Sequence, residues 1–255
     1  MSSVVYLSQA YFLLQKIHES PALHTVWYFL LEKPVKSKKE EKRIERLFRL
    51  VHILKHPPEH TYDILHFFAQ WFSEDKQGIF IILKEKEEIN DIGSLEELAT
   101  VLMNFHEYVE LDSSLEEFIK AAFATIMIQK MQILSLPIVR LTFKEHPDFW
   151  CCLDVSMRNA VDTLDLLSLL KNDVDKKIAA FGRNSHAVGK VMTIFYRKPV
   201  VQSKHIQSIL NVAKPNALLF IEKALQAGIF QRVTSKQRNN IYSNAGIMHI
   251  FFNFS

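Results

Sequence analysis

Glycine is scarce in this chain, whose 255 residues include 6 glycines against 19 phenylalanines. So few glycines argue against a fold with many tight turns and against a glycine-rich loop that cradles phosphates. Helices joined by short polar connections need little glycine and suit this composition. The apolar fraction of 48% is ample for a globular core. We therefore expect a mainly α-helical protein.

Cysteine is nearly absent as well, and the only two cysteines, Cys151 and Cys152, are neighbours. Adjacent cysteines cannot join distant segments, and a disulfide between them would be strained. Two reduced, partly buried thiols in an intracellular protein are the simplest interpretation. A redox-active or metal-binding pair is the alternative.

A long uninterrupted apolar run is also missing. The longest candidates, around residues 121–128 and 246–252, fall well short of the roughly 18–20 residues that cross a bilayer. The N-terminal stretch lacks the basic segment of a secretory signal, and Ser8 and Gln9 interrupt its apolar run. We expect a soluble, cytoplasmic protein without a membrane partner.

The sequence lacks complete catalytic motifs: it has no nucleophile elbow, no glycine-rich loop and no His-Glu-x-x-His pair. His52 and His56 have the i,i+4 spacing that can chelate a metal. However, no Glu follows His52, and Pro57 breaks the helix before His60. We predict no catalytic residue, no metal and no cofactor, with a metal at these histidines as the alternative.

Helices dominate the predicted structure of the first 181 residues. Ser94 and Glu97 form the capping-box pattern, which marks the start of a helix. The apolar stretch after Lys120 predicts a central, buried helix, and the aromatic group from Phe67 to Phe72 predicts core rather than a binding groove. Helices are expected at residues 6–18, 21–32, 37–56, 62–72, 95–109, 115–135 and 148–181.

Two details of this region bear on the core. The stretch Gly78–Leu83 is β-branched and fits either a strand or a buried helical turn. In the last of the predicted helices, the apolar spacing indicates that the core positions are Leu164, Leu167, Leu170 and Ile178.

The charge balance changes sign near Gly182. Residues 184–255 hold nine Lys or Arg and one acid, Glu222, a net charge of +8, while the whole chain carries +3. Residues 1–183 therefore carry −5. This change, with a glycine where a helix would end, predicts an acidic α-helical domain at 1–181 and a basic domain at 184–255. A basic end attracts polyanions, of which nucleic acid is the commonest.

The basic domain has the element order of a winged helix. Gly228 would close the third helix in the left-handed geometry that glycine adopts without strain. The helical spacing predicts that the buried face of that helix consists of Leu218, Ile221, Ala224 and Leu225. The expected elements are a helix at 186–196, an extended piece at 199–201, a helix at 203–210, a turn at 211–213, a helix at 214–227, strands at 229–233 and 240–243 joined by a basic connection, and a helix or strand at 245–251.

A winged helix-turn-helix domain can place its third helix in a major groove and its wing on the backbone or in a neighbouring groove. Lysine and arginine would meet phosphates, while asparagine and glutamine could read base edges or hold the backbone. Glu222 and Leu219 lie on the same helix, so a protein-docking or structural winged helix is the alternative. The residues predicted to contact duplex DNA are Lys214, Asn216, Lys223, Arg232, Lys236, Gln237 and Arg238.

Three stretches carry a resemblance to a known family: Ala213-Lys214-Pro215-Asn216-Ala217, Leu225-Gln226-Ala227-Gly228-Ile229 and Ser235-Lys236-Gln237-Arg238-Asn239-Asn240-Ile241-Tyr242. This region resembles the C-terminal winged helix of Fic-family proteins, in which a helix that carries a leucine ends in an Ala-Gly-Ile/Leu turn and the wing carries Lys-x-Arg-Asn-x-x-Tyr. The resemblance implies a winged helix and, in the family's enzymes, adenylyl transfer from ATP to a hydroxyl of a target protein.

The catalytic loop of the Fic family is missing from this chain. That loop reads His-Pro-Phe-x-Asp/Glu-Gly-Asn-Gly-Arg, whereas the one His-Pro pair here, His146–Pro147, is followed by Asp148-Phe149-Trp150, and Gly-Asn-Gly-Arg is absent. No catalytic residue of the family can therefore be placed on this sequence.

These patterns predict a non-catalytic protein that contacts DNA as a regulator, with the helical domain providing a protein contact or homo-oligomerisation. One alternative is a scaffold that uses the winged helix for protein docking. The other is a divergent Fic-related adenylyltransferase.

Overall fold

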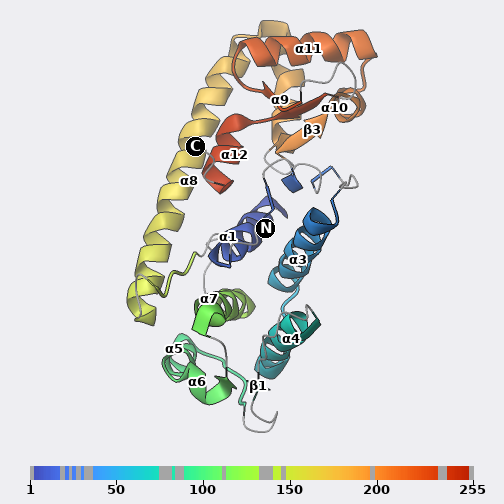
Figure 1. Cartoon of the computed structure of the whole chain (residues 1–255). Coiled ribbons are helices and arrows are strands. Elements are labelled where there is room, and N and C mark those ends of the chain that lie inside the picture. Colours follow the sequence, from blue (N-terminus) through green and yellow to red (C-terminus); the bar gives the residue numbers. More distant parts are fainter. Residues whose placement is uncertain are drawn as a thin grey trace. The chain divides into compact units, whose positions relative to one another are not determined.

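The chain is mainly α-helical, and its C-terminal part contains a small three-stranded antiparallel sheet (Figure 1). Its fold comes from a computed structural model. Contacts divide the chain into two units, one made of Met1–Ser8, Ala22–Glu40 and Asp162–Ser255, the other of Gln9–Pro21 and Glu41–Val161. The structure describes residues 3–17, 21–22, 25–26, 30–31, 37–74, 82–83, 89–110, 113–131, 140–144, 148–195, 199–234 and 240–252.

Three long helices contribute residues to both units: α1 (Ser3–Lys16), α3 (Lys38–Lys55) and α8 (Phe149–Ala179). Each lies close to a predicted helix. α3 begins just after Ser37 and ends before the Pro57–Pro58 pair, as expected from the helix-breaking effect of proline. The predicted helix at 21–32 lies largely outside the described residues.

The unit that contains Glu41–Val161 is built around α7 (Ser113–Lys130), against which α4 (Thr61–Glu74) and α5 (Leu95–Met103) both pack. Every residue from 121 to 128 is buried, which confirms the predicted central helix. The rings of Phe68, Trp71 and Phe72 surround that of Phe118 at centroid distances of 6.0, 5.9 and 5.9 Å. These aromatic side chains are core, as predicted.

A capping box starts α5, as the sequence predicted. The Ser94 hydroxyl accepts the Glu97 backbone N–H at 3.1 Å, and the Glu97 carboxylate accepts the backbone N–H groups of Ser94 and Gly93. A short helix, α6 (Phe105–Tyr108), follows α5. Strand β2 (Val109–Glu110) then pairs with β1 (Ile82–Leu83), so the end of the ambiguous 78–83 stretch is a strand.

The C-terminal elements follow the predicted order closely. They are a 3₁₀ turn at Gly182–Asn184, α9 (Ser185–Phe195), β3 (Val200–Gln202), α10 (Ser203–Leu210), α11 (Lys214–Gln226), β4 (Gln231–Arg232), β5 (Ile241–Ser243) and α12 (Ala245–Phe252). The sheet order is β3-β5-β4, with Tyr242 of β5 opposite both Val201 and Arg232. This arrangement is compatible with a winged helix.

Residues in the left-handed region follow two helices of this part, α10 and α11. Asn211, at φ 51°, follows α10, and Gly228, at φ 66°, follows α11. Asparagine and glycine are the residues that adopt this conformation most readily. The predicted glycine cap at Gly228 is confirmed.

Two predicted core positions are wrong. Leu164 on α8 is 38% exposed and Leu218 on α11 is 42% exposed. On α11 the buried line is Ala217, Ile221 and Ala224, so Leu218 is turned about 100° away from Ala217, by helix geometry. On α8 the spacing indicates the side of the helix but not where along it another element covers that side. Ile178 is buried, and Leu167 and Leu170 are half-buried.

Across the described residues, no helix combines the length and the apolar character that a bilayer crossing requires. Both cysteines are reduced thiols, with Cys151 exposed and Cys152 buried. The Cys152 sulfur accepts the Thr142 backbone N–H at 3.1 Å, and burial raises the pKa of this thiol.

Candidate functional site

The first candidate surface is the helix pair α10–α11, which Figure 1 shows beside α9 and the sheet in the C-terminal part of the chain. α10 and α11 pack on each other, with Ile206 buried on the first helix and Ala217 and Ile221 on the second. Pro215 lies in the first turn of α11, where its missing N–H leaves no helical hydrogen bond unmade. The left-handed Asn211 lets the chain reverse between the helices.

The structure places four of the seven residues predicted to contact DNA. Lys214 and Asn216 are exposed at the start of α11, Lys223 is half-buried near its end, and Arg232 is exposed on β4. The other three, Lys236, Gln237 and Arg238, lie outside the described residues.

Helix geometry brings only some of these side chains together. Asn216 and Lys223 are seven residues apart, so they lie on the same side of α11 about 10 Å from each other along its axis. Lys214 is turned about 200° from Asn216 and lies on the other side. The structure therefore groups Asn216 with Lys223 and leaves Lys214 apart from them.

The outermost line of α11 has a different character. Pro215, Leu219, Glu222 and Gln226 follow each other at helical spacing, and all four are exposed. Leu219 is 50% exposed and Leu218, beside this line, 42%. The sequence identified Leu219 as an apolar residue on this helix, but it predicted that Leu218 would be buried. Ala217 and Ala224 are small enough to pack closely against other elements and, with Ile221, form the buried line. Their spacing could have shown that Leu218 lies off that line.

Hydrogen bonds fix both ends of the basic connection between β4 and β5. The Val233 N–H donates to the Ile241 carbonyl at 2.9 Å, and the Ile241 N–H donates to the Thr234 hydroxyl at 3.2 Å. The Gln231 amide donates to the Ser243 hydroxyl at 3.1 Å. The base of the connection is therefore held to the sheet, one residue beyond the exposed Arg232.

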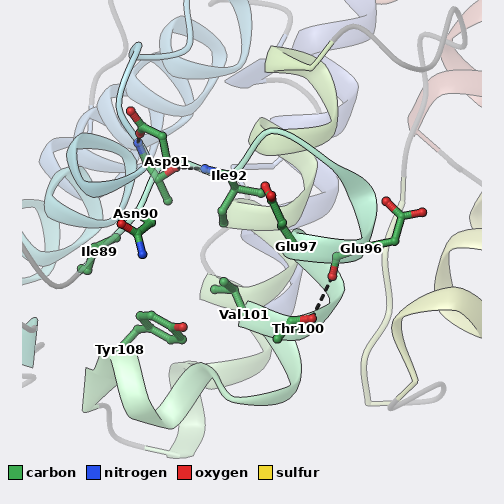
Figure 2. Close-up of a pocket in the computed structure, with 10 residues that line it drawn as sticks. Ile89, Asn90, Asp91, Ile92, Glu96, Glu97, Thr100, Val101 and Tyr108 are labelled. Carbon is green, nitrogen blue, oxygen red and sulfur yellow. Dashed lines mark hydrogen bonds between the residues drawn. The ribbon is translucent and has the colours of Figure 1, made fainter.

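A second candidate is a cavity of approximately 540 Å³ in the other unit. The loop that precedes α5 provides one wall, α5 itself another, and Tyr108 of α6 and Thr61 of α4 complete it (Figure 2). Figure 2 shows Val101 between Tyr108 and Glu97. The lining residues from the loop and α5 are Ile89, Asn90, Asp91, Ile92, Glu96, Glu97, Thr100 and Val101.

One edge of this cavity is fixed by an ion pair. The Asp91 carboxylate lies 2.9 Å from Nδ1 of His60 and accepts the backbone N–H of Thr61 at 2.7 Å. The Thr61 hydroxyl in turn accepts the Ile92 backbone N–H at 3.0 Å. These bonds attach the loop at 91–92 to the start of α4.

The contact between His60 and Asp91 shifts the pKa of both side chains. The hydrogen bond from His60, followed by that from the Thr61 N–H, lowers the pKa of Asp91 from 3.8 to about 2. The hydrogen bond to Asp91 and then its charge raise the pKa of His60 above 6.5. Because both side chains are about half exposed, the pair is a surface contact that water and salt screen.

The histidines that suggested a metal lie at the end of α3. His52 and His56 are both exposed, with ring centroids 5.4 Å apart. Within the described part of the chain, no group of three or more His, Cys, Asp or Glu side chains is arranged to hold a metal ion.

Comparison with known proteins returns no family model that matches this chain and no curated protein that matches it.

Proposed function

We propose that this protein contacts duplex DNA through a winged helix-turn-helix formed by its C-terminal residues. The observation that carries the proposal is the order and pairing of the elements. A helix, a strand, the α10–α11 pair and two further strands follow one another, and the first strand pairs with the last to give the order β3-β5-β4. That topology supports a winged helix, a fold that presents its third helix and its wing to DNA.

The charge of this segment supports a polyanionic partner. Residues 184–255 carry nine basic residues and a single acid, Glu222. Lys214 and Arg232 are exposed, so both can meet phosphates without a cost of burial. Because a contact of this kind depends on counterion release, its affinity must fall steeply with salt.

The outer line of α11 argues that binding depends on shape and charge more than on base sequence. Leu219 and Glu222 occupy positions that would face the groove. Leucine cannot form a hydrogen bond with a base edge, and a glutamate can only accept one from cytosine. Asn216, on the flank beside Lys223, and Gln226, at the end of the outer line, are the described side chains of α11 that can form a bidentate contact with adenine. We therefore expect weak sequence preference.

The test is binding of a fluorescent duplex by the full chain between about 50 and 200 mM salt. The variant Lys214→Glu/Lys223→Glu should bind much more weakly at low salt. Lys171→Glu/Lys176→Glu makes the same change of charge on the exposed surface of α8 and is the matched control. Equal loss in both variants would indicate a response to net charge alone, and an absence of binding at low salt would overturn the proposal.

A second candidate function is protein docking, and the exposed pair Leu218 and Leu219 favours it. Two adjacent leucines on α11, 42% and 50% exposed, suit an apolar contact better than a phosphate backbone. If docking is the function, Leu218→Ser/Leu219→Ser should abolish partner capture, and the unsubstituted chain should show no salt-dependent binding of duplex. If DNA is the partner, the same variant should keep its salt-dependent affinity for duplex.

A further inference from the structure

The cavity between the 89–92 loop, α5 and Tyr108 has the size and the lining of a small-molecule site. Its volume of approximately 540 Å³ lies within the range of ligand pockets, about 300–1,000 Å³. Isoleucine and valine side chains and the ring of Tyr108 provide an apolar surface, while Asn90, Thr61 and Thr100 provide polar groups. Pockets that bind small organic molecules combine these two kinds of surface.

The acidic residues that line the cavity favour a positively charged ligand. Of the described lining residues, three are acidic, Asp91, Glu96 and Glu97, and none is a lysine or arginine. The two nearby cations that act on Asp91, His60 and Lys130, lie outside the lining. An anion would therefore be repelled, whereas a cation would be attracted.

The walls of the cavity are fixed before any ligand arrives. Glu97 is held by the capping box of α5, with its carboxylate 2.7 Å from the Gly93 N–H, and Asp91 is held by Thr61 and His60. These bonds orient two of the carboxylates. The bonds to Glu97 come from neutral backbone groups and leave its charge in place, whereas protonated His60 offsets part of the charge of Asp91. A ligand would not have to order this wall, and this lowers the cost of binding.

We propose that this cavity binds a small organic cation, with an ammonium group near the carboxylates and an apolar or aromatic body against Val101 and Tyr108. The ring of Tyr108 can pack against an aromatic body. The proposal does not rest on DNA contact, because every residue that it uses belongs to the unit containing Glu41–Val161.

The test is titration of the full chain with benzylammonium, followed by the backbone amide signals of residues 89–101 and 108. Saturable shifts should appear at Asn90, Val101 and Tyr108. Phenylacetate, which has the same ring and the opposite charge, should bind at least about tenfold more weakly. Benzyl alcohol, which is neutral, should fall between the two.

Three variants test whether the binding is specific to the cavity. Asn90→Lys places a cation in the lining and should weaken benzylammonium by about tenfold. Met103→Lys adds the same charge on α5 at a 63% exposed position outside the lining, and should change affinity less than about twofold because solvent screens it. Val101→Trp should fill the space and abolish the shifts, with a melting temperature that shows the fold intact.

The absence of saturable shifts would overturn the proposal, as would equal binding of phenylacetate or equal loss in Asn90→Lys and Met103→Lys. Duplex binding measured on the same Asn90→Lys sample separates the two proposals, since that variant should retain it.

Discussion

Gly246 of α12 lies against the side chain of Leu170 on α8. A Cβ added at Gly246 would come within 2.5 Å of Cδ1 and 2.9 Å of Cδ2 of that leucine, closer than side-chain carbons approach each other. Both residues belong to the unit that contains the C-terminal sheet. The glycine therefore lets the last helix pack directly on α8.

Gly246→Ala should destabilise the protein by about 1 kcal/mol, the lower end of the cost of overpacking, because the colliding leucine atoms end a flexible, half-buried side chain. In a Leu170→Ala background the clash is gone, so Gly246→Ala should be neutral or slightly stabilising. Chemical denaturation of the four proteins in this cycle gives the coupling energy. An equal cost of Gly246→Ala in both backgrounds would contradict the packing that we describe.

Gly228→Ala should also cost about 1 kcal/mol, but for a different reason. An added Cβ would meet no atom within 4 Å, so the cost comes from the backbone, which has φ +66°. Gly228→Asn should cost less, because asparagine tolerates this conformation better.

Gly189→Ala is the matched control for Gly228→Ala. Gly189 lies inside α9 without a positive φ, and an added Cβ there again meets no atom within 4 Å. Alanine at this position should stabilise the protein by up to about 1 kcal/mol, because it favours the helix more than glycine does. Opposite signs for the two substitutions, measured by urea denaturation, are the expected result.

The contact between His60 and Asp91 predicts a pH dependence. The pKa of His60 is raised, so its contribution to stability is complete below pH 6.5 and is lost as pH rises through the folded value. The pKa of Asp91 is lowered to about 2, so its contribution is complete above pH 3.8 and is lost as pH falls toward 2. The pair therefore stabilises the fold most between these limits.

NMR titration of single variants tests this pairing. In Asp91→Asn the pKa of His60 should fall, since its strongest partner has lost its charge. In His60→Gln the pKa of Asp91 should rise from about 2 but stay below 3.8, because the Thr61 N–H still donates to the carboxylate. If the pKa of Asp91 were unchanged in His60→Gln, the histidine would not be its main partner.

Local signals in the sequence predicted much of the fold because they act over a few residues. The Ser94–Glu97 capping box starts α5, Gly228 follows α11 in the left-handed conformation, and the apolar run from 121 to 128 is buried. Exposure along a helix was harder to predict, because it depends on which element covers each turn. Leu164 and Leu218 have core-like spacing, yet both are exposed.

The two candidate sites also differ in how far the sequence predicts them. The residues of α11 were predicted from the order of elements, which is visible in the sequence. The cavity was not, because it joins Thr61, the 89–92 loop and Tyr108, and only the fold brings these together. The Asp91–Thr61 bond that closes its edge spans thirty residues and leaves no periodic signal. The resemblance to the Fic-family winged helix stays a prediction.

The salt dependence of duplex binding should tell phosphate contacts from base contacts on α11. Each lysine that neutralises a phosphate adds about 0.9 to the slope of log affinity against log salt. Lys223→Ala should therefore reduce that slope by about 0.9, and its loss of affinity should be similar for every duplex sequence. Asn216→Ala carries no change of charge, so it should leave the slope unchanged.

Asn216 and Lys223 form a matched pair for this measurement because they lie on the same side of one helix, and truncation of either removes no buried apolar side chain. If Asn216 reads adenine, its loss should cost about 1–3 kcal/mol on duplexes that present that base and little on the others. If it only holds the backbone, the loss should be the same on all duplexes. A slope that neither variant changes would mean that this side of α11 faces away from DNA and that the β4–β5 connection carries the contact.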